Sequence, residues 1–420
     1  MKRLRSFESF LQWQRDYQKA LGAAASQDLR GLLVDMRSRI SMNGDSAIYE
    51  YSQKFDNINP GYDLRVSPLS IEAAYEEVEE AYIEALKRAA ANIRAFHQNQ
   101  MPQNWEQEKG GVRYGNRFTP LESVGLYVPG GRAAYPSTVL MDAIPAVLAG
   151  VGRLVMVTPP NVTAPVLVAA DLCGVDDIYL VGGAQAVFAL ADGSTSVPKV
   201  DKIVGPGNVY VTQAKQMVYG KVDIDKPAGP SEVLVYIEDV KYASFAAAEM
   251  LAQLEHDPLA NAIVLAAPDV LDAVEASFNE QLPGLKRQSV LKDSVAFACF
   301  VEVESPEVAV TYINHIASEH LSLILDDYQP ILDKVKHAGS IFCGPYTPVT
   351  LGDYYAGTNH VLPTEGTARF ASPLGVMDFM KYSSFLSYDQ ATLTAAKDDL
   401  KILTEAEGFD AHYNAVTRRV

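Results

Sequence analysis

The sequence predicts an α/β protein with two Rossmann-like parallel-sheet domains and helical extensions at its N-terminal and C-terminal ends. From about residue 124 onward, short apolar β-rich runs alternate with amphipathic segments, a pattern typical of a parallel sheet covered by helices. The chain has 420 residues, more than the roughly 250–300 residues at which a single hydrophobic core stops growing. Its hydrophobic fraction of 48% and charged fraction of 21% are those of a folded globular protein. We therefore expect two α/β units.

The N-terminal quarter is predicted to be mainly helical. Residues 71–96 carry apolar side chains at helical spacing, with Glu and Lys on the other face. A first series of predicted strands lies at residues 124–128, 154–157, 178–181 and 202–204. A second series lies at residues 233–236, 262–265, 295–297, 321–324 and 340–342. Turn-forming clusters at Pro129-Gly130-Gly131 and Pro227-Ala228-Gly229-Pro230 are the expected crossings between the two units.

Charge and composition exclude several classes of partner. The 35 basic and 52 acidic residues give a net charge of −17, which repels a phosphate backbone, so we expect no nucleic-acid partner. Apolar stretches such as residues 143–152 are shorter than the ~20 residues that a membrane helix needs. Charged residues also interrupt the first residues before a secretory signal can form. Cys173, Cys299 and Cys343 lie far apart in apolar surroundings, as expected of reduced thiols in the cytoplasm.

Several histidines stand beside carboxylate or amide side chains. Gln253 and His256 are three residues apart at the end of a predicted helix, so their side chains emerge on one face of its last turn. Asp353 lies in a turn-rich stretch, and His412 lies near the end of the chain. Zinc accepts imidazole nitrogen, carboxylate oxygen and amide oxygen, so these four residues are candidate ligands of a catalytic or substrate-holding zinc ion. The alternative for His256 is a histidine satisfied by the carbonyls of a helix end.

The adjacent residues Glu319 and His320 suit a different task. Neighbouring side chains point to different sides of an element, so the two cannot comfortably bind one ion from a regular helix. At the junction of a helix and the predicted strand at 321–324, the carboxylate can activate water while the imidazole moves protons near neutral pH. The alternative is a surface glutamate beside a capping histidine.

Two glycine-containing segments follow predicted strands. Neither 205–210 nor 181–185 has the third glycine of the dinucleotide fingerprint G-x-G-x-x-G. Each segment nevertheless opens a predicted helix, whose first amide groups would face a bound anion. These segments favour nucleotide binding without a Rossmann signature.

Over nearly its whole length the chain resembles the histidinol dehydrogenase family, whose members depend on zinc and NAD. The resemblance lies in the motifs at residues 125–131, 182–186, 205–208, 227–232, 253–258, 318–321, 353–363 and 407–420. It implies the four-electron oxidation of L-histidinol to L-histidine through histidinaldehyde, the final steps of histidine biosynthesis. Ser318 stands where the family usually has proline before the Glu-His pair, which relaxes the backbone at that point.

The resemblance also assigns roles to individual residues. It implies Glu319 and His320 as the acid/base pair. One zinc ion per subunit is implied, with ligands at Gln253, His256, Asp353 and His412. NAD contacts are implied at Tyr127, Gln185 and Asn208. Contacts with the substrate are implied at Ser231, Gln253, His256, His320, Asp353, His360, Glu407 and His412.

A homodimer is implied as well, in which Glu407 and His412 of the C-terminal tail reach the active site of the partner. We expect residues 1–22 to form an N-terminal helical arm and residues 373–420 a dimerisation tail. Residues 23–125 with 232–372 are expected to form a discontinuous domain that carries the zinc and catalytic residues, and 126–231 an inserted domain on the NAD side.

Two other functions remain open from the residues alone. A zinc metallohydrolase would use the same ligands with Glu319 activating water, and it would need no nucleotide. A related zinc- and NAD-dependent dehydrogenase would oxidise a different primary alcohol. A covalent scheme with a cysteine thiolate is disfavoured, because no base stands beside Cys173, Cys299 or Cys343 in the sequence.

Overall fold

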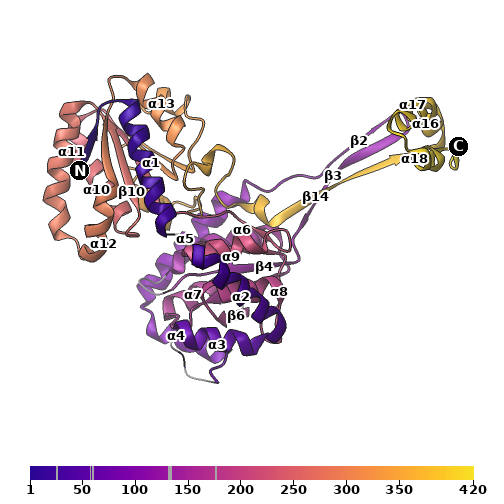
Figure 1. Ribbon diagram of the computed structural model, residues 1–420, viewed down its shortest axis with the longest axis horizontal. Helices are drawn as coiled ribbons and strands as arrows, with labels where there is room; N and C mark the ends of the chain where they lie inside the picture. Colours follow the sequence, from indigo (N-terminus) through magenta and orange to yellow (C-terminus); the bar gives the residue numbers. More distant parts are fainter. Residues whose placement is uncertain (25–26, 57, 59–60, 131–134, 176) are drawn as a thin grey trace.

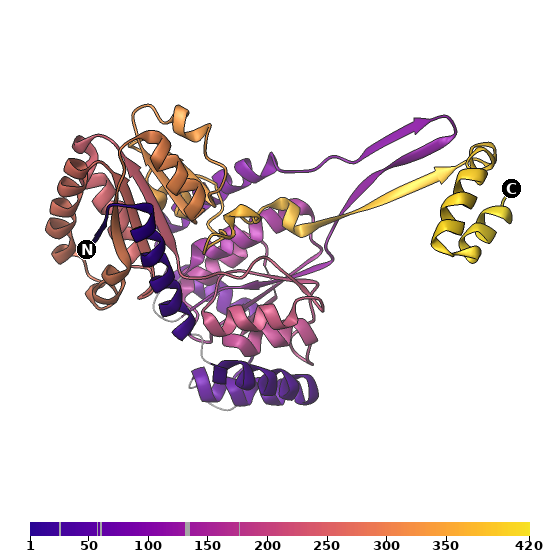
Figure 2. The same cartoon turned by 45° about the horizontal axis from the view of Figure 1, so that its top comes forward.

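The computed structural model describes residues 1–420 except 25–26, 57, 59–60, 131–134 and 176. Two parallel sheets, each covered by helices, form the body of the molecule, and a long antiparallel arm projects from it (Figure 1). The arm also stands clear of the body when the molecule is turned (Figure 2). The expected α/β class with two parallel-sheet units is therefore confirmed.

The first sheet has six parallel strands in the order β1-β11-β10-β9-β12-β13. Their bounds are β1 Lys2–Leu4, β9 Glu232–Ile237, β10 Asn261–Ala266, β11 Ala298–Glu302, β12 His320–Ile324 and β13 Ser340–Cys343. Successive side chains of β9 point to opposite faces, so Val233 and Val235 pack in one core and Leu234 and Tyr236 in the other. One face is covered by α10 (Ala243–Leu254), α11 (Pro268–Gln281) and α12 (Gln288–Ser294). The other is covered by α1 (Phe7–Ala24), α13 (Pro306–Ile316) and α14 (Gln329–Leu332).

The second sheet has five parallel strands in the order β6-β5-β4-β7-β8. Their bounds are β4 Ser123–Tyr127, β5 Arg153–Thr158, β6 Asp177–Leu180, β7 Lys202–Val204 and β8 Asp223–Ile224. One face packs on α4 (Pro68–Glu77), α5 (Glu80–Gln98), α6 (Pro136–Ala149) and α7 (Ala164–Leu172). The other packs on α2 (Gln27–Asn43), α3 (Asp45–Asp56), α8 (Gly183–Asp192) and α9 (Val209–Val218).

Several boundaries differ from the prediction. The predicted strand at 295–297 is a short 3₁₀ helix, and the strand begins at Ala298, because one apolar run covers both elements. The predicted helical segment at 71–96 is divided into α4 and α5 at Val78 and Glu79, both of which are extended. Residues 227–230 do cross between the sheets. The cluster at 129–131 does not cross between the sheets, because it connects β4 and β5, which belong to one sheet. Its Gly131 lies outside the described residues.

The packing of the N-terminal region differs from the expected division into domains. Residues 1–22 form no free arm, because β1 pairs with β11 and the α1 side chains Phe10 and Trp13 lie in the core of the first sheet. Helices α2 to α5 cover the second sheet, although residues 23–125 were expected to join residues 232–372. Amphipathic spacing shows which face of a helix is buried, but it does not say which sheet buries that face.

The C-terminal extension is partly β-structure. Strand β14 (Met380–Tyr388) pairs antiparallel with β3 (Val112–Pro120), which pairs with β2 (Trp105–Lys109). Three helices follow at the tip of the arm: α16 (Gln390–Ala395), α17 (Lys397–Glu407) and α18 (Asp410–Thr417) (Figure 1). None of these three helices, all fully described, contains a buried residue.

Among the described helices, none has the length and apolar character needed to cross a membrane.

Candidate active site

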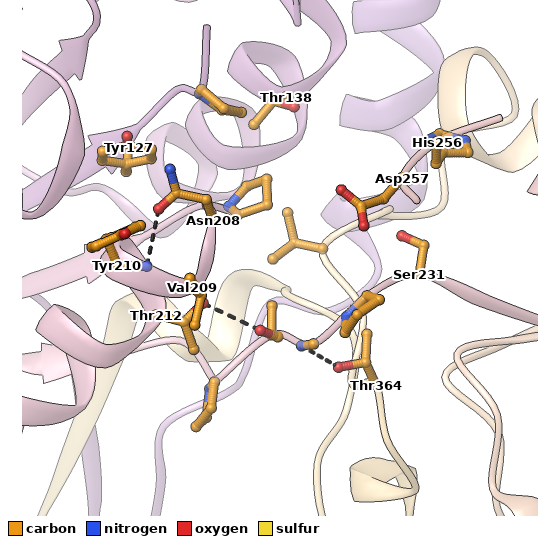
Figure 3. A pocket seen from close by; sticks show the side chains of 18 of the residues that line it. Tyr127, Thr138, Asn208, Val209, Tyr210, Thr212, Ser231, His256, Asp257 and Thr364 are labelled. Atoms are coloured by element: carbon orange, nitrogen blue, oxygen red, sulfur yellow. Dashed lines mark hydrogen bonds between the residues drawn. The ribbon is translucent and has the colours of Figure 1, made fainter. Parts of the chain in front are cut away.

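A cavity of about 1740 Å³ is lined by loops of both sheet units. The carboxyl end of the second sheet contributes the loops after all five of its strands, β4 to β8. The amino ends of the first sheet contribute the residues just before β9, β10 and β12. Figure 3 shows Tyr127 and Asn208 on one side of the cavity and Ser231 and His256 on the other. The two units thus face each other across a single space.

The loops after β4 and β7 lie at the point where the strand order of the second sheet reverses. The chain runs from β4 outward to β5 and β6, then returns to place β7 on the other side of β4. In open α/β sheets ligands bind at such a switch point, outside the carboxyl ends of the strands. Tyr127 ends β4, and residues 205–208 follow β7. The second sheet therefore places its binding crevice in the wall of this cavity.

The side chains expected to contact NAD are held in place there. The Tyr127 hydroxyl accepts a hydrogen bond from the Gly183 amide at 3.0 Å, and burial raises the pKa of Tyr127 to about 12. The buried Gln185 amide donates to Asp56 at 3.4 Å. Asn208 caps α9, where its side-chain oxygen accepts from the amides of Tyr210 (3.1 Å) and of the following residue.

Buried charged residues support the loop after β7. The Lys215 ammonium donates to the Gly205 carbonyl at 2.9 Å, and Asp225 accepts from the Gly205 amide at 2.9 Å. Lys215 and Asp225 also form a buried ion pair. Gly205 has φ +109°, and a Cβ there would lie 2.2 Å from the Tyr127 carbonyl oxygen, so only glycine fits. The loop is therefore held by hydrogen bonds with the charged side chains of Lys215 and Asp225 and by close packing of Gly205 against the Tyr127 carbonyl.

Two more charged residues extend this buried group. Neither carboxylate oxygen of Asp142 has a hydrogen-bond partner among the described residues, and burial raises its pKa well above the usual range. Burial lowers the pKa of Lys226, whose ammonium donates to the Val361 carbonyl at 3.2 Å. Val361 follows His360, so Lys226 connects the loop after β8 with the segment that carries His360.

Glu319 and His320 lie at the start of β12. Ala317 ends α13 in the left-handed region, with φ 53°, and turns the chain toward the pair. Ser318 is buried, and its hydroxyl donates to the His320 carbonyl at 3.0 Å, so a hydrogen bond holds the backbone here. Glu319 and His320 are 5% and 4% exposed, which excludes the alternative of a surface glutamate beside a capping histidine.

The His320 ring has a different neighbour at each nitrogen. Its Nδ1 lies 3.2 Å from the Glu232 carbonyl oxygen and 3.6 Å from Oε2 of Glu319. Its Nε2 lies 3.6 Å from Oδ1 of Asp353, an ion-pair contact, and has no hydrogen-bond partner among the described residues. A proton on Nδ1, donated to the carbonyl, leaves Nε2 as the available base.

Burial and mutual charge shift the pKa values of these groups. Burial raises the pKa of Glu319 to about 7, although the His320 charge opposes this. Burial alone would lower the pKa of His320, but the carboxylates of Glu319 and Asp353 raise it to about 9. Burial also works against ionisation of Asp353, yet its contact with His320 and the nearby imidazoles hold its pKa below the usual value. Both a carboxylate base and an imidazole base are thus available in the alkaline range.

The structure brings together three of the four expected zinc ligands in one part of the molecule. Gln253 lies in the last turn of α10, His256 follows that helix, and Asp353 lies in α15 (Val349–Tyr354). His256 and Asp353 both line the cavity, and burial lowers the pKa of His256. The buried Gln253 amide nitrogen lacks a hydrogen-bond partner within the described chain. Among the described residues, no group of three His, Cys, Asp or Glu side chains is close enough to hold a metal ion.

The remaining expected residues divide into two groups. His360 and Ser231 line the cavity; the His360 Nδ1 lies 3.0 Å from the Asp353 carbonyl oxygen, and burial lowers the pKa of His360. Glu407 and His412 are not brought to the cavity within one chain. They belong to α17 and α18 at the tip of the arm, far from α10 and β10 (Figure 1).

None of the three cysteines, all of which the structure describes, lines the cavity. Burial raises the pKa of Cys173 to about 12 and raises those of Cys299 and Cys343 as well. The thiolate that a covalent scheme requires is therefore disfavoured.

Comparison with known proteins agrees with this geometry. The family model described as Histidinol dehydrogenase matches residues 22–420. The chain belongs to the histidinol dehydrogenase family. It is 46% identical to the histidinol dehydrogenase of Listeria innocua, with 90% of each chain covered. It is 47% identical to that of Bacillus cereus, with 89% of each covered.

A solved member of the family shares the fold. The crystal structure of histidinol dehydrogenase from Elizabethkingia anophelis matches with a TM-score of 0.90 and 36% identity, covering 94% of this chain and 92% of that one. The resemblance inferred from the sequence motifs is confirmed.

Sequence reasoning missed several buried charged residues of this site, namely Asp142, Lys215, Asp225, Lys226 and Glu232. Some carried a signal that was overlooked. Asp142 interrupts the apolar run of α6, and Glu232 opens the apolar strand β9. A charge inside or next to such a run is costly to bury and is retained where it has a partner or a task.

Proposed function

We propose that this protein oxidises L-histidinol to L-histidine through histidinaldehyde and reduces two NAD molecules, completing histidine biosynthesis. The observation that carries the proposal is the buried pair Glu319 and His320 next to Asp353, in a cavity whose other wall is the switch point of a parallel sheet. This joins acid/base groups to a place suited to a dinucleotide. Membership of the family supports the same reaction.

NAD is proposed to lie along the loops after β4, β6 and β7, in contact with Tyr127, Gln185 and Asn208. The first amides of α8 and α9 open toward the cavity and suit the negative charge of a pyrophosphate. Hydride transfer itself is the chemistry of the nicotinamide, so the protein has to bind and orient it.

Zinc is proposed to be held by Gln253, His256 and Asp353 together with His412 of a second chain. The amide oxygen of Gln253, the imidazole of His256 and the carboxylate of Asp353 are all groups that zinc accepts, and His256 and Asp353 line the same cavity. When bound, the ion orients the amine and imidazole of the substrate rather than polarising the reacting oxygen. Ser231, His360 and Glu407 are proposed to supply further contacts with histidinol.

In the first half-reaction, His320 accepts the alcohol proton at Nε2 while a hydride leaves the carbinol carbon for NAD. The Glu232 carbonyl accepts the Nδ1 proton at 3.2 Å, which fixes the ring and its tautomer. The product of this half is histidinaldehyde.

In the second half-reaction, Glu319 removes a proton from water as it adds to the aldehyde. The resulting hydrate gives a second hydride to a second NAD and becomes the carboxylate of histidine. A pKa of about 7 suits Glu319 for this task, because such a carboxylate is a stronger base than an ordinary one and is ionised in about half of the molecules at pH 7.

A homodimer is proposed to complete the site. Each arm would carry Glu407 and His412 to the cavity of the partner, which they do not reach in their own chain. The arm exposes large apolar side chains that suit a contact with a second copy: Tyr382, Leu386, Tyr388, Ile402, Leu403 and Phe409. A cytoplasmic location is proposed, supported by three free cysteines.

Spectrophotometry tests the reaction class. NADH absorbance should appear when purified protein receives L-histidinol and NAD. A metallohydrolase would produce no NADH and would need no nucleotide, whereas a dehydrogenase of another primary alcohol would reduce NAD only with that alcohol.

A further inference from the structure

We propose that the side chain of Glu232 is a positioning residue that holds the catalytic Glu319 in place. This inference rests on the proposed function, because it takes Glu319 as the base of the aldehyde half-reaction.

Glu232 and Glu319 hold each other through reciprocal hydrogen bonds. The Glu232 amide donates to Oε2 of Glu319 at 2.8 Å, and the Glu319 amide donates to Oε1 of Glu232 at 3.2 Å. Both residues lie at the amino ends of neighbouring strands, β9 and β12. The Glu232 side chain is 7% exposed, so water does not substitute readily for these contacts.

The same carboxylate also holds the opposite rim of the cavity. Oε1 of Glu232 accepts from the Glu365 amide at 3.1 Å, and the Asn261 amide donates to Oε2 at 3.5 Å. Glu365 has φ 54°, a conformation that a non-glycine residue keeps only when its surroundings hold it. Its side chain occupies the space where a Cβ on Gly229 would lie, in the loop that leads to Ser231. Glu232 therefore ties the catalytic residue to a strained segment that lines the cavity.

A glutamate is the residue that these contacts require. Its two oxygens accept all three N–H donors, whereas glutamine offers one acceptor oxygen and turns its NH₂ group toward the remaining donor. Aspartate keeps both oxygens but is one methylene shorter, so it cannot reach the same donors. No Lys or Arg of the described chain forms an ion pair with Glu232. Its carboxylate is thus held by N–H donors alone.

Two substitutions, Glu232→Asp and Glu232→Gln, separate positioning from simple stability. We expect Glu232→Asp to lower kcat of the aldehyde half-reaction by about 10²-fold, the loss typical of a small misplacement of a catalytic group. Glu232→Gln should lose less, because its oxygen still accepts from the Glu319 amide. In both variants the alcohol half-reaction, measured with histidinol and NAD, should lose less than the aldehyde half, and the KM values for NAD and histidinol should stay within about twofold.

Asp192→Asn is the matched control. Asp192 is 5% exposed in its side chain and is paired with Lys221 and Arg37 at the far end of α8, outside the cavity. The Asp192→Asn substitution should lower the unfolding temperature without changing the ratio of the rates of the two half-reactions. If Glu232→Asp does not fold, Glu232→Gln is assessed alone by that ratio.

The outcomes distinguish the two claims. The role of Glu232 is overturned if every folded Glu232 variant keeps the wild-type ratio of aldehyde to alcohol half-reaction rates while Glu319→Gln is impaired in the aldehyde half. The proposed function then still stands. An unimpaired Glu319→Gln overturns the proposed role of Glu319 itself.

Discussion

Nε2 of His320 lies 3.6 Å from Oδ1 of Asp353, and both side chains are largely buried. The proposed proton acceptor is therefore next to a proposed zinc ligand. A substrate oriented on the metal would bring its alcohol to the base without further search, which is how positioning lowers a barrier. This contact underlies the predictions for the two half-reactions.

Replacement of Glu319 by Gln should separate the two oxidations. The amide cannot take a proton from water, so the aldehyde half should slow by about 10²–10⁴-fold, while the alcohol half, which relies on His320, should slow much less. Rapid-mixing measurement of NADH formation from histidinol and from histidinaldehyde provides the comparison. Equal losses in both halves would contradict the assignment of Glu319.

The rate should depend on pH in a way set by the two bases. Each acts in its deprotonated form, so each half-reaction is fast above the pKa of its base and declines as pH falls through it. The alcohol half should therefore rise until about pH 9, the pKa of His320, and the aldehyde half until about pH 7, the pKa of Glu319. A pH series of single-turnover rates checks this, and an alcohol-half rate that is flat between these two values argues against His320 as the base.

Lys215→Met should weaken both the fold and NAD binding. The substitution leaves buried Asp225 without its cation and frees the Gly205 carbonyl, which should cost about 3–5 kcal/mol of unfolding free energy. A displaced loop after β7 should raise the KM for NAD and leave the KM for histidinol nearly unchanged. Lys334→Met is the control, because Lys334 and its partner Glu307 are 49% and 71% exposed and such exposed pairs contribute about 0–1 kcal/mol. Urea denaturation and steady-state kinetics give the two values.

Mixed dimers test whether the arm acts on the partner subunit. His412→Asn and Glu319→Gln chains should each be weakly active alone, and the His412→Asn chain should bind less zinc by elemental analysis. Unfolding and refolding the two together should restore activity, because one of the two sites then combines an intact Glu319 with an intact His412 from the other chain. No recovery in a confirmed mixed dimer means that His412 acts within its own chain.

Much of the fold follows from local patterns in the sequence. The apolar runs predicted most strands, since each is flanked by turn-forming residues and separated by amphipathic helices. The three-residue strand β1 was missed because Lys2–Leu4 is too short to show alternation. The packing of α2 to α5 on the second sheet was also missed, since it depends on contacts between distant segments.

The site was predictable to a similar extent. Nine residues singled out from the sequence line the cavity: Tyr127, Gln185, Asn208, Ser231, His256, Glu319, His320, Asp353 and His360. The hydrogen bonds of Glu232 to Glu319 and Glu365 could not be foreseen, because they join residues 87 and 133 positions apart. The second bond also depends on a left-handed backbone at Glu365. Sequence patterns report on neighbouring residues, so they do not reveal hydrogen bonds between distant segments.

The number of NADH molecules formed per histidinol consumed tests the account most directly. With limiting histidinol and excess NAD, we predict two NADH per histidinol and stoichiometric L-histidine, because one cavity is proposed to carry out both oxidations. One NADH per histidinol with accumulation of the aldehyde, or no NADH at all, would contradict it.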